Sequence, residues 1–151
     1  WWRLHMFIAF KELNSIISQI NGAYHDICTK VGISDSEFDI FYVLCEQGDG
    51  CKQSLIYKSS GIGKSTINSA IKKMEKEGYL KVEKDDGRST RVFLTDKGKA
   101  RSAETAEHII EIENRIYESF SKKDREAFIK LNRDYLNALK KEIDLYGVRK
   151  E

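Results

Sequence analysis

The stretch from Lys64 to Glu77 contains residues whose types and spacing could contact a nucleic acid. On a helix with about 100° per residue, one face is apolar and carries Ile67, Ala70, Ile71 and Met74. The opposite face carries Ser65, Ser69, Lys72 and Lys76, with Asn68 and Lys73 at its borders. Short polar groups near the start of such a helix suit base edges in the major groove of DNA, and lysines further along suit phosphates. An ordinary solvated face explains this helix, taken alone, equally well.

The charge distribution favours contact with a polyanion. Between Lys52 and Arg101 the sequence has 13 basic and 6 acidic residues, a net charge of +7. The remainder has 13 basic and 18 acidic residues, a net charge of −5. A basic middle flanked by acidic ends is typical of a lobe that binds nucleic acid.

Catalytic and cofactor chemistry has little support in the sequence. The three histidines, His5, His25 and His108, are scattered, and the three cysteines form no Cys-x-x-Cys pair. We therefore expect neither a metal site nor a disulfide framework. Gly63-Lys64-Ser65 resembles the end of a phosphate-binding loop, but Lys58 stands where that motif requires glycine. These observations predict a protein that is not an enzyme and holds no cofactor.

Two helices are predicted ahead of the basic segment. Apolar residues recur every three or four positions through the first thirty residues, which predicts one long amphipathic helix. Ser34 and Glu37 form a capping box that begins the next helix, with Ile33 and Phe38 as a hydrophobic staple. The turn Gly48-Asp49-Gly50 ends that helix.

The basic segment itself predicts a helix-turn-helix followed by a hairpin. A short helix over about 52–59, a turn at Gly61 and a second helix over about 64–77 fit the first motif. Strand-like runs over 79–84 and 90–94 surround Asp85-Asp86-Gly87-Arg88, which indicates a β-hairpin, or wing.

The C-terminal third predicts two more long helices. Thr95 caps one that continues through Phe120, and Ser121, with Asp124 three residues later, caps another. Ala103 is taken as one of the apolar positions of the first of these helices. Their apolar stripes, like that of the first thirty residues, have no further lobe to cover them. We expect an intertwined homodimer interface built from residues 1–30 and 99–151.

Four segments, taken in order, resemble the MarR family of winged helix-turn-helix regulators. They are Ile-Gly-Lys-Ser-Thr-Ile at 62–67, Glu-Lys-Glu-Gly-Tyr-Leu at 75–80, Asp-Gly-Arg at 86–88 and Leu-Thr-Asp-Lys-Gly at 94–98. The resemblance is specific between about Ser34 and Gly98. It implies a dimer whose recognition helices enter successive major grooves of a palindromic site, while the wings approach the flanking minor grooves.

The resemblance and the helical pattern together identify candidate DNA-binding residues. They are Lys64, Ser65, Thr66, Asn68, Ser69, Lys72, Lys73, Lys76, Asp86, Arg88 and Arg91. The sequence also departs from the family pattern. Gly87 stands where arginine is frequent, Val82 replaces a common basic residue, Gly63 replaces a common capping serine, and the wing is short.

Family members commonly bind a small apolar or aromatic effector near the junction of the dimer and DNA-binding parts. The candidates here are Tyr24, His25, Phe38 and Tyr42, and ordinary core packing is the favoured explanation for them. Some members sense oxidants through a thiol. Cys28 and Cys45 are expected in the core, whereas Cys51, after a glycine turn, is the cysteine expected to be exposed.

These inferences define one expected protein. The fold is α+β and mainly helical, and residues 1–151 form a single domain whose winged helix-turn-helix lobe spans 34–98. It is expected to be cytoplasmic and away from membranes, because neither a secretion signal nor a spanning segment is evident. Its partners are double-stranded DNA, a second copy of itself and a small-molecule effector, and it acts as a repressor. The alternative is a winged-helix protein–protein interaction module without DNA binding.

Overall fold

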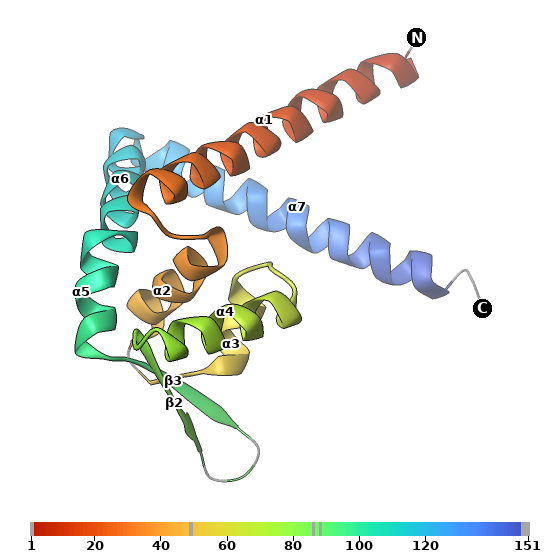
Figure 1. The fold of residues 1–151 in the computed structure, drawn as a ribbon. Helices are drawn as coiled ribbons and strands as arrows, with labels where there is room; N and C mark the ends of the chain where they lie inside the picture. The colour runs from red at the N-terminus through yellow and green to blue at the C-terminus, as the bar shows by residue number, and fades with distance from the viewer. Residues whose placement is uncertain (1, 49, 86, 88, 149–151) are drawn as a thin grey trace. The chain divides into compact units, whose positions relative to one another are not determined.

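The computed structural model describes residues 2–48, 50–85, 87 and 89–148 and is mainly helical, as expected. In chain order the elements are α1 (Trp2–Val31), α2 (Asp35–Gln47), β1 (Cys51–Lys52), α3 (Gln53–Ser59), α4 (Lys64–Lys76), β2 (Leu80–Lys84), β3 (Thr90–Leu94), α5 (Asp96–Glu104), α6 (Ala106–Ser119) and α7 (Lys122–Val148) (Figure 1). The chain forms two compact units, Trp1–Ile110 and Glu111–Glu151. The winged helix-turn-helix lies in the first.

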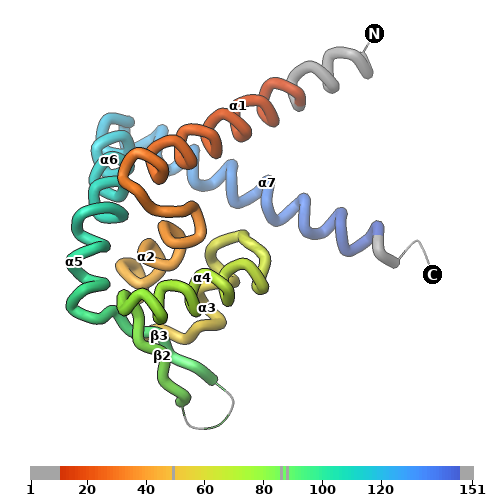
Figure 2. The backbone as a smooth tube through the Cα atoms, in the orientation of Figure 1, coloured from red at the N-terminus to blue at the C-terminus, as the bar shows by residue number. Residues whose placement is uncertain are grey.

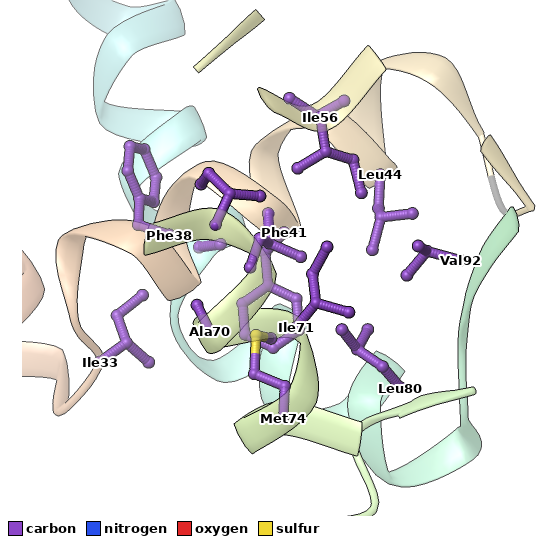
Figure 3. Packing of buried hydrophobic residues seen from close by; sticks show 14 of the residues in the cluster. Ile33, Phe38, Phe41, Leu44, Ile56, Ala70, Ile71, Met74, Leu80 and Val92 are labelled. Atoms are coloured by element: carbon purple, nitrogen blue, oxygen red, sulfur yellow. The ribbon is translucent and has the colours of Figure 1, made fainter. Parts of the chain in front are cut away.

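The core of the first unit lies between α2, α3, α4 and the sheet. Ile40 of α2, Ile56 of α3, Ile67 and Met74 of α4, and Val92 of β3 are completely buried. Figure 3 shows Ile71 and Met74 directed toward Phe41 in the middle of this cluster. The apolar face predicted for the second helix of the motif is therefore confirmed.

Helices α2, α5 and α7 begin at the capping residues predicted from the sequence. The Ser34 backbone N–H donates to Glu37 Oε2 at 2.7 Å and the Glu37 N–H donates to Ser34 Oγ at 3.2 Å, which completes the capping box. Thr95 Oγ1 accepts from the Gly98 N–H at 3.0 Å at the start of α5. Ser121 Oγ accepts from the Asp124 N–H at 3.1 Å at the start of α7.

The sheet has the strand order β1-β3-β2 and is antiparallel throughout. The hairpin of β2 and β3 was predicted, with Val82 opposite Val92. Strand β1 was not predicted, because a strand of two residues is too short to show an alternating pattern. It forms because the chain at Gly50 runs close to β3, where the Gly50 N–H donates to the Val92 carbonyl at 3.1 Å. This close approach requires glycine, because a Cβ at Gly50 would lie 2.6 Å from the Phe93 ring.

The prediction of one helix from Thr95 through Phe120 is wrong, because the helix breaks at Thr105. That residue has φ −130° and ψ −80°, and its Oγ1 donates to the Arg101 carbonyl at 2.6 Å. A threonine hydroxyl that bonds back to the preceding turn bends a helix. The break buries Thr105, Ala106 and Ile109, while Ala103, expected to be an apolar contact, is exposed.

Two of the three cysteine expectations are also wrong. Cys28 is buried as expected, and burial, followed by the charges of Asp35 and Asp39, raises the pKa of its thiol to about 11. Cys51 is buried, because β1 pairs with β3, and Cys45 is exposed, with its sulfur 3.6 Å from Ser102 Oγ.

The second unit contains the end of α6 and the whole of α7. Phe120 and Phe128 lie with ring centroids 6.5 Å apart, and the Arg125 guanidinium lies 5.2 Å from the Tyr117 ring. Within the described part of the chain, no helix is both long enough and apolar enough to cross a membrane.

Candidate nucleic-acid interface

The helix α4 presents the polar face that the sequence predicted. Ser65, Ser69, Lys72 and Lys76 are all exposed at four- or three-residue spacing, opposite the buried Ile67 and Met74. Lys64 and Thr66 are exposed in the first turn, and Lys64 Nζ lies 5.2 Å from the Tyr57 ring centroid. Gly63 caps the helix without a side-chain hydrogen bond, as expected from the missing serine. The N-terminal turn therefore keeps unpaired backbone N–H groups beside a lysine.

The turn between α3 and α4 is fixed by a glycine and a serine. Gly61 has φ +70°, a left-handed conformation that favours glycine. The Ile62 N–H donates to Ser60 Oγ at 3.2 Å, and Ile62 packs against the core cluster. This anchoring sets where α4 begins relative to α3.

Asn68 differs from the other polar residues of α4 because it already has a protein partner. Gln53, the first residue of α3, donates from Nε2 to Asn68 Oδ1 at 2.8 Å, and both side chains are half-buried. Sequence reasoning missed Gln53. Its fifteen-residue separation from Asn68 matches no helical or strand period, so no local signal marks the pair.

Lys73 is also engaged within the protein. Its ammonium lies 3.0 Å from Glu37 Oε1, and that carboxylate is only 11% exposed whereas Lys73 is 58% exposed. Burial alone would raise the pKa of Glu37, but the Ser34 N–H and the Lys73 ammonium together hold it below its usual value. The same hydrogen bond, which Lys73 donates to Glu37, raises the pKa of Lys73. Glu37 therefore joins the start of α2 to α4 through Lys73.

Arg91 in the wing strand β3 is tied to two neighbouring segments. Its Nε donates to Asp85 Oδ2 at 2.9 Å, and its other nitrogen NH1 donates to the Gly50 carbonyl at 2.9 Å. The Asp85 N–H donates to the Ser89 carbonyl at 2.9 Å across the base of the wing tip. The predicted contacts Asp86 and Arg88 lie outside the described residues.

The wing lies between α4 and α5 in the chain (Figure 2), and hydrogen bonds around Thr95 and Lys97 fix it against them. Thr95 Oγ1 donates to the Gly78 carbonyl at 2.6 Å, and the Thr95 N–H donates to the Tyr79 carbonyl at 3.1 Å. Lys97 Nζ donates to the Glu77 carbonyl, the C-cap of α4, at 2.7 Å. A Cβ at Gly98 would overlap the Tyr79 carbonyl group. The Leu-Thr-Asp-Lys-Gly segment thus fixes the hairpin against α4.

The structure brings three of the four candidate effector residues together in ring contacts, whereas His25 contacts Asp35. The Phe38 ring stacks on Tyr24 with centroids 6.1 Å apart and meets Tyr42 edge-on at 5.6 Å. His25 Nδ1 lies 3.1 Å from each carboxylate oxygen of Asp35, on the exposed side of the same helix junction. Among the described residues, no group of three or more histidine, cysteine or acidic side chains could hold a metal ion.

Comparison with known proteins agrees with this geometry. The model of the MarR family matches residues 31–89. No curated protein matches the chain. A MarR family regulator from Neisseria meningitidis has a TM-score of 0.75 at 20% identity, over 89% of this chain and 94% of that one. A MarR transcriptional regulator from Methanosarcina mazei Go1 is 28% identical with a TM-score of 0.62, over 87% and 96%.

A third similar structure concerns the regulation of DNA binding by a small molecule. It is BpsR of Bordetella bronchiseptica, whose DNA binding is regulated by 6-hydroxynicotinic acid. The identity is 19% and the TM-score 0.63, over 82% of this chain and 98% of BpsR.

Proposed function

We propose that this chain, whose winged helix belongs to the MarR family, is a sequence-specific DNA-binding transcriptional regulator. It binds a palindromic operator as a homodimer, represses transcription by occupying that site, and releases it when a small-molecule effector binds. The observation that carries the proposal is the α4 helix, which is buried on one face and exposes serines and lysines on the other beside a hairpin. A helix of this kind in a helix-turn-helix is the element that enters the major groove.

The charges available to phosphates are concentrated on Lys72 and Lys76. Within the described part of the chain neither lysine has an ion-pair or hydrogen-bond partner, whereas Lys73 is paired with Glu37. An unpaired exposed ammonium binds phosphate without first giving up an internal ion pair. Lys72 and Lys76 therefore supply the non-specific electrostatic part of binding, and Asn68 and the serines supply the contacts to bases.

The homodimer is supported by apolar surface on each unit. In α1, Leu13, Ile16, Ile17 and Ile20 are between 38% and 47% exposed. In the second unit the exposed apolar side chains include Ile116, Phe128, Leu131, Leu139 and Ile143. Exposed apolar stripes on helices of this length are typical of surfaces covered by another chain. A second copy of the chain covers the stripe of each unit, and the resulting dimer places two α4 helices on one palindrome.

Release by an effector is supported by the aromatic group at the junction of α1 and α2. Tyr24, Phe38 and Tyr42 join the helix of the proposed dimer interface to the helix that packs on α4. A ligand inserted among these rings changes the spacing of the two recognition helices. DNA affinity falls if the ligand prefers the spacing that does not fit the operator. The regulation of BpsR by 6-hydroxynicotinic acid makes small aromatic acids the first compounds to test.

The test is selection of bound sequences from random duplex DNA by the purified protein, together with sedimentation at micromolar concentration. We expect a symmetric site with half-sites about one helical turn apart and a steep decrease of affinity with salt. Sedimentation should give about twice the chain mass of 17.5 kDa. A folded protein that binds no duplex at low salt would contradict the proposal and favour the protein-docking alternative. A monomer that remains soluble would contradict the dimer.

A further inference from the structure

The side chain of Glu75 joins α4 to the middle of the wing. Its Oε1 accepts from the Val82 backbone N–H at 3.2 Å. Val82 is the third residue of β2, which is an edge strand because the strand order is β1-β3-β2. A carboxylate only accepts and a backbone N–H only donates, so the two groups can be joined in one sense alone.

The Val82 N–H points away from β3. Val82 lies opposite Val92, whose carbonyl accepts from the Gly50 N–H on the β1 side. In an antiparallel pair, two opposite residues that do not exchange hydrogen bonds direct their N–H and C=O groups away from each other. The Val82 N–H is therefore on the outer edge of β2, where α4 supplies its acceptor.

The base of the hairpin is fixed by other bonds. The Gly78 N–H donates to the Glu75 carbonyl at 3.0 Å and the Tyr79 N–H donates to the Met74 carbonyl at 2.9 Å, which is the pattern of a Schellman motif. Leu80 then enters the core. Beyond Leu80 the hairpin projects past α3 and α4 (Figure 1), and the bond from the Glu75 side chain holds it part-way along.

A hairpin that is fixed at its base alone acts as a lever. Lys84, at the outer end of β2, lies four residues after Leu80, which is about 13 Å at roughly 3.3 Å per residue. Over that length a pivot of about 20° at Leu80 moves the outer end by about 4–5 Å. The minor groove of DNA is about 6 Å wide, so this displacement takes the wing out of a groove next to the one that α4 occupies.

We propose that Glu75 is a positioning residue for DNA binding, which holds the wing at a fixed angle to α4 so that the wing reaches the groove flanking each half-site. The inference rests on the proposed DNA binding and adds to it the residue that couples the two contact elements. Glu75 acts through Val82 and need not touch DNA. Because its negative charge repels phosphates, its charge and its hydrogen bond have opposite effects on affinity.

Two substitutions separate the hydrogen bond from the charge. Glu75→Gln removes the charge and keeps an oxygen that accepts from the Val82 N–H. Glu75→Met removes both the charge and the acceptor at nearly the same side-chain length. Glutamate, glutamine and methionine have similar helix propensities, and Glu75 is exposed, so both variants should fold. The difference between the two variants therefore reports the acceptor alone.

The experiment compares the affinities of each chain for two duplexes that contain the selected operator. One duplex ends at the half-sites, and the other extends about one helical turn, roughly 10 base pairs, beyond each of them. The wild-type chain should bind the longer duplex more tightly, because its wings reach the added grooves. Glu75→Gln should keep this gain in affinity. Glu75→Met should reduce it by about 2- to 12-fold for each wing, the equivalent of one hydrogen bond, and should bind the shorter duplex as tightly as Glu75→Gln does.

Amide hydrogen exchange of the free protein tests the contact in the absence of DNA. The Val82 N–H should exchange faster in Glu75→Met than in Glu75→Gln or the wild type, because its acceptor has been removed. Glu77, an exposed acidic residue at the C-cap of α4, supplies the matched control. Glu77→Gln and Glu77→Met should show equal gains from the flanks and equal exchange of Val82.

Thermal unfolding confirms that each variant is folded before its affinities are compared. Equal gains from the flanks in Glu75→Gln and Glu75→Met would overturn the inference, and so would equal exchange of Val82 in the two variants. A wild-type chain that binds the operator but gains nothing from the flanks would also overturn it and leave the proposed function intact. Absence of any duplex binding by the wild-type chain would refute the proposed function itself.

Discussion

Gly98 is the position where a single added methyl group should separate the wing from the rest of the first unit. An alanine Cβ there would overlap the Tyr79 carbonyl oxygen, approach the carbonyl carbon at 2.9 Å and lie 3.3 Å from Leu94 Cδ2. The first two atoms belong to the backbone, which cannot rotate away as a long side chain can. Either α5 or the start of the hairpin must move.

The expected cost follows from what that movement disturbs. Overpacking a tight contact costs about 1–3 kcal/mol. The Thr95 N–H bond to the Tyr79 carbonyl and the Thr95 hydroxyl bond to the Gly78 carbonyl lie in the same contact, and each contributes about 1 kcal/mol. Alanine returns about 1 kcal/mol through its higher helix propensity. The net loss for Gly98→Ala is therefore about 2–4 kcal/mol, which corresponds to a fall in Tm of roughly 4–16 °C for a chain of this size.

The assay is thermal unfolding followed by circular dichroism at one fixed protein concentration, because association with a second copy makes Tm concentration-dependent. Gly22 in α1 provides the matched control, since a Cβ there meets nothing within 4 Å. Gly22→Ala should stabilise the protein by up to about 1 kcal/mol through helix propensity alone. A Gly98→Ala protein as stable as the wild type would show that the contact with Tyr79 is not close enough to exclude a methyl group.

Three further predictions concern particular charges and thiols. Lys73→Ala should cost about 1 kcal/mol, because it leaves the buried Glu37 carboxylate without its ammonium, yet it should leave the salt dependence of DNA binding nearly unchanged. Lys72→Ala should leave stability nearly unchanged and lower the salt slope of DNA binding by about one ion. Equal salt slopes for the two variants would contradict the proposal that Lys72, and not Lys73, contacts phosphate. Burial, and then the charge of Asp35, raises the pKa of Asp39 from 3.8 to about 6, so its stabilising contribution is full below about pH 4 and is lost as the pH rises through 6. Asp39→Asn should therefore raise the free energy of unfolding at pH 8 by about 1 kcal/mol after allowance for solvent screening, seen as a higher Tm, with no gain near pH 4. In the native protein a thiol reagent should modify Cys45 and spare the two buried cysteines, so modification that persists in Cys45→Ser would contradict the burial pattern.

The sequence by itself determined the elements of the candidate site. The buried face of α4, the capping residues Ser34, Thr95 and Ser121, and the strands of the wing depend on interactions within a few residues. Periodicity and capping are local properties, so they can be recognised without knowing which elements meet. The basic character of the middle of the chain is likewise a matter of composition.

Only the tertiary structure decided which of the polar residues on α4 have protein partners. Lys72 and Lys73 are adjacent and chemically identical, but Glu37, thirty-six residues earlier, lies within reach of Lys73 alone. Gln53 reaches Asn68 only because the turn at Gly61 folds α3 against α4. The burial of Cys51 in β1 and the helix break at Thr105 have the same origin, since both depend on contacts between segments. Hydrogen bonds and ion pairs require their partners within about 3–4 Å, and for residues far apart in the sequence the fold sets that distance.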